Sequence, residues 1–200
     1  ELDPRMADVN VVVACDVNNP LCGTRGASAI FGPQKGATYE DVQELDAALA
    51  NFAEVISKDL NTDVADIPGA GASGGLGAGL MGFFDARLRL GADIVLEAVS
   101  LEEHLVDADL VIVGEGQFDR STVFNKSPVA VAQRAKIRGI PVIGIAGSLG
   151  AGFAEVHDHG IDAVFSLVSR PMSLKAAMDD TKRLVAIATE EACRAIALSI

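Results

Sequence analysis

Apolar residues between Thr38 and Leu60 recur at alternating intervals of three and four, which is the spacing of one helical face. They are Val42, Leu45, Leu49, Phe52, Ile56 and Leu60. Thr38 and Asp41 have the spacing of a capping box, so the pattern predicts a helix that begins after Thr38. Before this helix, the continuous β-branched run Val9–Cys15 predicts a strand that is buried on both faces.

Glycine dominates the next part of the chain. The segment Pro68–Gly79 predicts an irregular start to a second helix, which ends near Leu90. Periodicity leaves residues 92–99 open between strand and helix. The pair Ser100 and Glu103 then predicts a short capped helical turn.

From Asp109 onward, short apolar runs alternate regularly with helical patterns. The predicted strands are 110–113, 142–146 and 163–166, and the predicted helices are 127–138, a segment reaching about 159, and 173–197. Ser127 is expected to be the N-cap of the first helix, with Pro128 at its first position. This order predicts an α/β fold with a parallel sheet, and a composition shift near residue 100 predicts two domains, 1–100 and 101–200.

Composition limits the classes of function. The 200 residues are 50% hydrophobic but only 4% aromatic, and the net charge is −12. Nucleic acids and anionic membrane surfaces attract positive charge, so we expect neither as a partner. The chain begins without an apolar signal segment, and the run Ile67–Phe84 is too rich in glycine for a membrane span. We therefore expect a cytoplasmic enzyme or binding domain.

Cysteine and histidine do not indicate a metal site. The three cysteines are Cys15, Cys22 and Cys193. They lack the paired spacing of metal ligands, and we expect them to be reduced thiols in the core. His157 and His159 have no further ligand types clustered beside them, so we expect an exposed helix end with Gly160 as the C-cap.

The strongest candidate for a functional segment is the connection Gly114–Ser127. It follows the carboxyl end of a predicted strand, where open parallel sheets bind ligands, and its length is unusual for a βα loop. Its Glu115, Asp119, Arg120 and Lys126 supply the carboxylates and cations that phosphoryl transfer needs. The alternative is a solvated loop with surface ion pairs.

A second candidate is Asp16–Ala37, in which Asp16 directly follows the first predicted strand. No acidic residue occurs from Val17 to Tyr39 in this acidic chain, whereas Arg25 and Lys35 are present. Such a window suits an anionic ligand. An irregular structural loop that uses glycine for backbone freedom is the alternative.

Gly69, Gly71 and Gly74 match the dinucleotide-binding fingerprint in spacing only, because no good strand precedes them. An NAD-binding oxidoreductase is therefore disfavoured. A helix start that packs closely, or that lets the backbone approach a ligand, explains these glycines better. The chain contains no Walker A motif, no protein-kinase catalytic loop and no G-x-S-x-G element.

Several long blocks follow one another in a specific order. They are residues 15–21 (Cys-Asp-Val-Asn-Asn-Pro-Leu), 31–37 (Phe-Gly-Pro-Gln-Lys-Gly-Ala), 68–78, 108–116, 142–147 and 159–166. Together they resemble the bacterial glycerate kinase family that phosphorylates the 2-hydroxyl, over nearly the whole chain. The resemblance implies a two-domain enzyme that uses ATP and Mg²⁺ to phosphorylate D-glycerate. Residues 101–200 would belong to a flavodoxin-like parallel sheet with flanking helices, and residues 1–100 to a second α/β domain inserted within it.

Members of this family carry a comparable stretch before the first residue of this chain. The resemblance therefore implies a C-terminal half, and we expect these 200 residues alone to show little or no kinase activity. It leaves open a homo-oligomer or pairing with an N-terminal half. The alternative from another class is a non-catalytic α/β module that binds a nucleotide or another anion.

We hypothesise that Asp119 orients or deprotonates the acceptor hydroxyl, or holds Mg²⁺, and that Lys126 and Asp16 join it as catalytic residues. The residues expected to bind substrate or phosphate are Arg25, Lys35, Gly69, Gly71, Gly74, Gly114, Glu115, Gly116 and Thr122. The family commonly has Arg, Gln and Gly where this chain has Gln117, Ser121 and Asn125. These three departures put phosphate contacts at those positions, and the substrate preference, in doubt.

Overall fold

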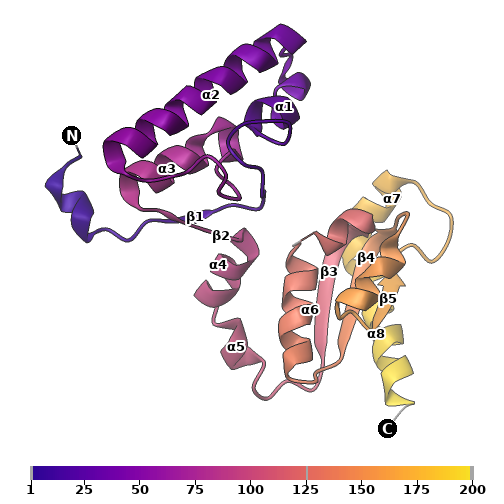
Figure 1. Cartoon of the computed structure of the whole chain (residues 1–200). Coiled ribbons are helices and arrows are strands. Elements are labelled where there is room, and N and C mark those ends of the chain that lie inside the picture. The colour runs from indigo at the N-terminus through magenta and orange to yellow at the C-terminus, as the bar shows by residue number, and fades with distance from the viewer. Residues whose placement is uncertain (1, 125, 199–200) are drawn as a thin grey trace. The chain divides into compact units, whose positions relative to one another are not determined.

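The computed structural model describes residues 2–124 and 126–198, and the chain divides into two compact units (Figure 1). The units are Glu1–Ile94 and Val95–Ile200. Each contains a parallel sheet with helices beside it, which confirms the predicted α/β class. The assignment of residues 1–100 to an inserted domain and 101–200 to a flavodoxin-like domain stays a prediction.

The first unit is built around the long helix α2. Its elements are the 3-10 helix η1 (Pro4–Asp8), β1 (Val12–Ala14), α1 (Ala27–Phe31), η2 (Pro33–Lys35), α2 (Tyr39–Leu60), η3 (Ala72–Gly74), α3 (Leu76–Phe84), β2 (Arg87–Arg89) and the start of α4 (Gly91–Ala98). Helices α1 and α3 lie along α2 (Figure 1). The core between them consists of Leu21, Ala53, Ile56, Val64, Ala70 and Ala78.

The predicted capping box at the start of α2 is confirmed. Asp41 N donates to Thr38 Oγ1 at 3.1 Å, and Thr38 N donates to Asp41 Oδ2 at 2.8 Å. The predicted apolar face is covered from Leu49 to Ile56, where Ile56 is buried, whereas Leu45 and Leu60 are exposed.

The prediction of a doubly buried strand at Val9–Cys15 was wrong. Only Val12–Ala14 forms a strand, and Val12 is 41% exposed. The reason is that β1 pairs with β2 alone among the described residues, so this small sheet does not form the interior of a layered domain.

The second predicted helix is also shorter than expected. It ends at Phe84 rather than near Leu90, because Asp85 adopts a left-handed conformation (φ 50°) and Arg87–Arg89 pairs with β1. A pairing between segments so far apart leaves no local signal in the sequence. Residues 92–99, which periodicity left open, lie mostly in helix α4.

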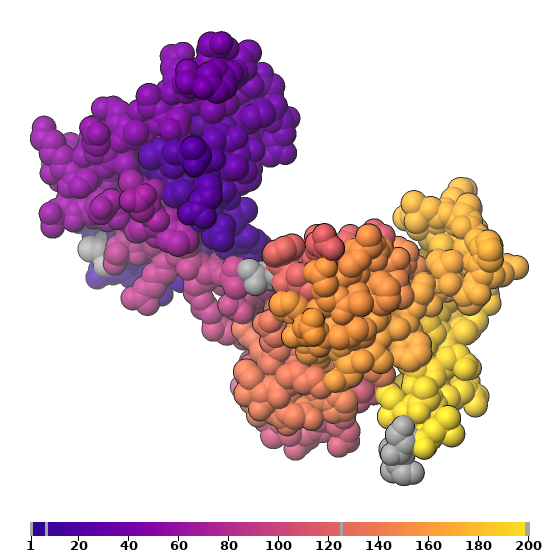
Figure 2. Space-filling view, turned by 45° about the vertical axis from the view of Figure 1, so that its right-hand side comes forward, coloured from indigo at the N-terminus to yellow at the C-terminus, as the bar shows by residue number. Residues whose placement is uncertain are grey.

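The second unit contains a three-stranded parallel sheet in the order β3-β4-β5. Its elements are α5 (Leu101–His104), β3 (Val111–Phe118), η4 (Arg120–Val123), α6 (Ser127–Ile137), β4 (Val142–Leu149), η5 (Phe153–His159), β5 (Ala163–Ser166), α7 (Leu174–Asp179) and α8 (Thr181–Ala197). Helix α6 packs on one face of the sheet over the larger core, and α8 packs on the other face against Ile143 and Ile145 (Figure 1). In the space-filling view, the α7–α8 segment (yellow) lies against the orange part of the same unit (Figure 2).

Strand β3 extends five residues beyond the predicted end, so the connection to α6 is shorter than expected. Glu115 pairs with Ala146 and Phe118 with Leu149 of β4. Glycine has a low strand propensity, which hid this extension in the sequence. Here glycine serves close packing, because a Cβ on Gly147 would lie 2.5 Å from the carbonyl oxygen of Gly116.

Several helix ends differ from the prediction. The N-cap of α6 is Lys126 rather than Ser127, and Ser100 precedes α5 in a left-handed conformation without a side-chain cap. The helix that reaches His159 is a 3-10 helix, which ends at the left-handed Gly160 as expected. The closing helix is interrupted at Asp180.

The three cysteines are free thiols, but none of them is fully buried. Cys15 and Cys22 are half-buried, and Cys22 packs against the core around Ile56. Cys193 is exposed, so the prediction of a core position was wrong for this residue. Cys193 lies on the outer side of the amphipathic helix α8, where the pattern of neighbouring residues decides burial more than residue type does.

Candidate active site

Asp119 is the first residue after β3 and lies at the carboxyl end of the parallel sheet, where α/β sheets bind ligands. It caps η4, because Asp119 Oδ1 accepts hydrogen bonds from Ser121 N at 2.8 Å and from Ser121 Oγ at 2.5 Å. In return, Asp119 N donates to Thr122 Oγ1 at 3.1 Å. These bonds hold the Asp119 carboxylate in one orientation.

Thr122 links the backbone of Asp119 to an ion pair. Thr122 is fully buried, and its hydroxyl donates to Glu115 Oε2 at 3.3 Å. The other carboxylate oxygen of Glu115 lies 2.8 Å from Lys126 Nζ, at the start of α6. A strand, a 3-10 helix and a helix start therefore meet in one polar network. We refer to Glu115, Asp119, Ser121, Thr122 and Lys126 as the β3 cluster.

The β3 cluster controls the charge of its members. The hydrogen bonds from Ser121, assisted by the charge of Lys126, lower the pKa of Asp119 below its ordinary value. The hydrogen bond to Glu115, together with the charges of Glu115 and Asp119, raises the pKa of Lys126. Both groups are therefore charged at neutral pH. A held carboxylate beside a held cation can orient a hydroxyl or a metal ion and, next to it, a phosphate oxygen.

The connection after β4 packs closely against the end of β3. Gly150 N donates to the carbonyl oxygen of Phe118 at 2.7 Å. A Cβ on Gly150 would lie 2.7 Å from Gln117 Nε2 and 3.1 Å from Asp119 Cβ, so a larger residue would displace the Gln117 side chain. Of the family departures, Gln117 thus lies against this connection and Ser121 belongs to the β3 cluster, whereas Asn125 lies outside the described residues.

The remaining predicted residues of this segment have other surroundings. Arg120 forms an exposed ion pair with Glu155 at 2.9 Å, which matches the alternative of a surface ion pair. Gly114 and Gly116 lie inside β3 and line a cavity of 840 Å³ that also touches α7 and α8. A role for these two glycines in phosphate binding stays a prediction.

In the first unit, Asp16, Lys35 and Gly74 line one cavity of 330 Å³. The structure thus brings together predicted site residues from three separate segments. Asp16 Oδ1 accepts a hydrogen bond from Gly91 N at 2.8 Å, which fixes the carboxylate at the start of α4. Lys35 forms no ion pair with any described residue, so its charge is available to an anion. We refer to this hollow as the Lys35 cavity.

Three other predicted residues of this unit lie apart from the Lys35 cavity. Gly69 and Gly71 are buried, and both of their N–H groups donate to the carbonyl oxygen of Asn19, at 3.1 and 3.0 Å. A Cβ on Gly71 would lie 2.3 Å from Pro20 O, so close packing accounts for this glycine. Arg25 is exposed and does not line the cavity. Ligand contacts by these three residues stay predictions.

Two serines in these sites were missed by sequence reasoning. Ser73 lines the Lys35 cavity and has a left-handed backbone (φ 51°), which is uncommon for a residue other than glycine and recurs at functional sites. The only sequence feature that could have indicated Ser73 was its position inside the glycine-rich segment Pro68–Gly79. Ser121 donates its hydroxyl hydrogen to Asp119, and its closeness to that carboxylate in sequence was the available signal.

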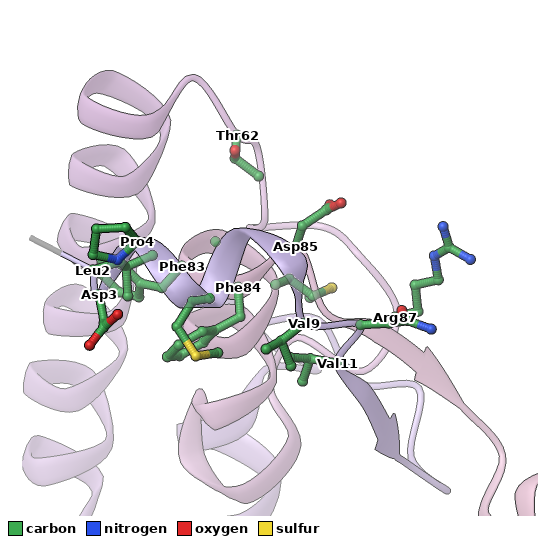
Figure 3. Close-up of a pocket in the computed structure, with 14 residues that line it drawn as sticks. Leu2, Asp3, Pro4, Val9, Val11, Thr62, Phe83, Phe84, Asp85 and Arg87 are labelled. Carbon is green, nitrogen blue, oxygen red and sulfur yellow. The ribbon is translucent and has the colours of Figure 1, made fainter.

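Another hollow of the first unit, 530 Å³ in volume, lies between η1, α3 and β2 (Figure 3). Figure 3 shows Asp3 and Pro4 on one side and Arg87 on the other, with Phe84 between them. Asp3 is already paired with Arg5 at 2.6 Å. The charged groups do not converge on one point, so this hollow offers no chemistry comparable to that of the β3 cluster.

Residues 1–197 match the sequence model of the glycerate kinase family. This chain belongs to the glycerate kinase family. Family relatives include the glycerate kinase of Halalkalibacterium halodurans, which is 52% identical over 99% of this chain. The glycerate 2-kinase of Escherichia coli is 55% identical over 84% of this chain. A crystal structure from Salmonella typhimurium LT2, assigned as a glycerate kinase 2, superimposes on 99% of this chain with a TM-score of 0.81 and 46% identity.

The chain spans about half the length of these family members. It covers 51% of the H. halodurans protein, 44% of the E. coli protein and 51% of the S. typhimurium chain. Within the described part of this family member, no helix has the length and apolar character needed to cross a bilayer.

Proposed function

We propose that this chain forms part of a cytoplasmic glycerate kinase, which transfers the γ-phosphoryl group of ATP to D-glycerate. The proposed product is 2-phosphoglycerate, since the E. coli relative carries the name glycerate 2-kinase. Family membership supports the reaction class. The observation that carries the proposal for this chain is the held carboxylate of Asp119 beside Lys126 at the end of the sheet.

The lowered pKa of Asp119 bears on its role. A carboxylate with a low proton affinity is a weak general base, but it stays ionised and can orient a hydroxyl or bind a cation. The ammonium group of Lys126 can make two kinds of contact at once. The ion pair with Glu115 positions the group, and its remaining hydrogens can be donated to a phosphate oxygen. The β3 cluster would then act through positioning and electrostatics, which dominate catalysis of phosphoryl transfer.

The oxygens of the β3 cluster are compatible with Mg²⁺. This ion prefers hard oxygen ligands and is commonly held by one or two carboxylates together with water and substrate phosphates. Asp119 supplies one such carboxylate, whereas that of Glu115 is engaged by Lys126 and Thr122. Since residues 2–124 and 126–198 contain no cluster of three His, Cys, Asp or Glu side chains suited to a metal, ATP would complete the coordination. Bound Mg²⁺ would neutralise charge that develops on the phosphate oxygens.

The Lys35 cavity suits the organic acid. Lys35 brings a positive charge that is not paired with any described residue, Ser73 brings a hydroxyl, and Asp16 brings a fixed acceptor. The volume suits a molecule of a few carbon atoms. A carboxylate on Lys35 and a hydroxyl on Asp16 would recognise a hydroxy acid such as D-glycerate.

The test uses a chimaera, in which these 200 residues replace the matching half of the H. halodurans glycerate kinase. ATP- and D-glycerate-dependent release of ADP is measured for this protein and for its Asp119→Asn variant. We expect turnover by the chimaera and a loss of about 10²-fold or more in kcat for the variant. Asp107→Asn, at an exposed carboxylate before β3, is the control and should leave kcat unchanged.

Two outcomes would contradict the proposal. A folded chimaera that binds ATP but never releases ADP would favour the non-catalytic nucleotide-binding module. Near-normal turnover by Asp119→Asn would remove this residue from the mechanism.

A further inference from the structure

A second hollow adjoins the Lys35 cavity in the first unit. It has a volume of 280 Å³ and is lined by residues of α1 and α2, which pack side by side (Figure 1). Phe31, Lys35 and Gly74 line both spaces. A Cβ on Gly74 would meet no atom within 4 Å, so the space beside this shared residue is open. We refer to the second space as the α1–α2 hollow.

The α1–α2 hollow differs in chemistry from the Lys35 cavity. Most of its side chains are apolar, and they are Ala27 and Phe31 of α1 with Leu45, Ala48 and Leu49 of α2. Among the described residues that line it, only Lys35 and Ser28 have polar side chains. Asp16 and Ser73 line the Lys35 cavity alone. A polar space and an apolar space thus adjoin at one cation, which suits a ligand with an anionic head and a carbon chain.

Ser28 is the one polar group set into the apolar wall. The residue is only 6% exposed, and its hydroxyl forms no hydrogen bond with any described residue. Nevertheless, no fully buried side-chain oxygen in the described part of the chain lacks a partner. The Ser28 oxygen must therefore border open space, and the α1–α2 hollow is a space that Ser28 lines. Because buried hydroxyl groups are normally hydrogen-bonded, this one is available to a ligand.

We propose that the α1–α2 hollow is a binding subsite for D-2-hydroxy acids whose carbon chain is longer than that of glycerate and ends in a hydroxyl. The carboxylate binds Lys35 and the 2-hydroxyl binds Asp16, as proposed for glycerate. The rest of the chain passes Gly74 into the hollow, where the terminal hydroxyl bonds Ser28. This inference rests on the proposed role of the Lys35 cavity in holding the organic acid, and it extends the class of acids that the site accepts.

A series of acids separates the contributions to binding. Calorimetry measures the affinity of the 200-residue chain for D-glycerate, D-lactate, D-2-hydroxypentanoate and D-2,5-dihydroxypentanoate. D-2-hydroxypentanoate exceeds D-lactate by two methylene groups, and burying them should tighten binding about tenfold. The terminal hydroxyl of D-2,5-dihydroxypentanoate should add about fivefold through Ser28.

Ala48 and Ala47 provide a matched pair of variants. Both are exposed alanines on α2, but only Ala48 lines the hollow. Ala48→Leu places a larger side chain in the hollow and should remove the tenfold preference for D-2-hydroxypentanoate over D-lactate. Ala47→Leu should keep this preference. Ser28→Ala should keep it as well and remove only the fivefold gain from the terminal hydroxyl.

Three results would overturn the inference. Equal affinities for D-lactate and D-2-hydroxypentanoate, with D-glycerate bound, would overturn it and leave the proposed role of the Lys35 cavity intact. A preference that Ala48→Leu and Ala47→Leu change equally would place the longer chain outside the hollow. A chain that binds none of the four acids would contradict this inference and the proposed role of the cavity together.

Calorimetry needs no turnover, so the kinase proposal is tested separately. The expected order of affinities, found beside a chimaera that releases no ADP, would support the subsite and contradict the proposed kinase activity.

Discussion

Lys126 and Glu115 form an ion pair of 2.8 Å that joins the start of α6 to the inner part of β3. The pair orients the ammonium group beside Asp119, whose own position depends on Ser121 and Thr122. Two charges of opposite sign are thus held at the carboxyl end of the sheet.

Replacing Lys126 by methionine should impair catalysis more than stability. The side chain is 36% exposed, so an ordinary structural contribution is small, whereas a lost charge at a transferring phosphate is costly. We expect kcat/KM of the chimaera for ATP to fall about 10²-fold for Lys126→Met. Lys136→Met is the control, because Lys136 is also 36% exposed and also paired, with Asp162 at 2.6 Å. Equal losses in both variants would argue against a role of Lys126 in phosphate binding.

Ser73→Gly separates backbone strain from ligand binding in the Lys35 cavity. Glycine adopts the left-handed conformation without a steric penalty, so the variant should be no less stable than the unmodified chain. Loss of the hydroxyl should raise the KM for D-glycerate about tenfold if it bonds the carboxylate. Asn61→Gly, at a position with φ 53° outside the cavity, should keep the KM unchanged. A normal KM for Ser73→Gly would exclude the hydroxyl from substrate binding.

Asp162 should make the stability of the second unit depend on acid pH. Burial opposes ionisation of this carboxylate, but hydrogen bonds from Lys136 and Val142 N, with the charge of Lys136, lower its pKa overall. A lowered pKa in the folded state contributes stability above the ordinary carboxyl pKa, and this stability is lost as the pH falls through the folded value. The side chain is 47% exposed, so solvent screening limits the contribution to about 1 kcal/mol.

Urea unfolding of the 200-residue chain and of Asp162→Asn measures this effect. At pH 7 the variant should be less stable by about 1 kcal/mol, and the difference should shrink below about pH 4. Asp158→Asn, at an exposed residue of η5, serves as the control. A difference that does not change with pH would contradict the assigned cause.

The helices with strong local signals were predictable from the sequence. Helix α2 combines an apolar periodicity with a capping box, and both act within a few residues of the chain. Strand β5 is a short β-branched and aromatic run between turns, and its predicted bounds are those observed. The last residues of β3 were missed because Gly114 and Gly116 have no strand propensity of their own.

The candidate sites likewise contain residues that the sequence identified and residues whose role only the fold shows. Asp119 and Lys126 were identified because they lie in a long connection after a predicted strand. Asp16 was identified because it directly follows a predicted strand, and Lys35 because it lies in a window without acidic residues. The roles of Gly69 and Gly71 were not visible, since only the fold shows that Asn19 takes their N–H groups and that Pro20 leaves no room for a side chain.

The sequence by itself determined the α/β class, the family and the segments that carry charge at strand ends, because these depend on local patterns and on residue identity. The tertiary structure decided which of those residues meet. It paired β1 with β2, joined Glu115 through Thr122 to Asp119, and placed Ser73 beside Lys35 in one cavity. Such relationships depend on contacts between residues far apart in the chain. These contacts form only when the whole unit is folded, so no single segment of the sequence indicates them.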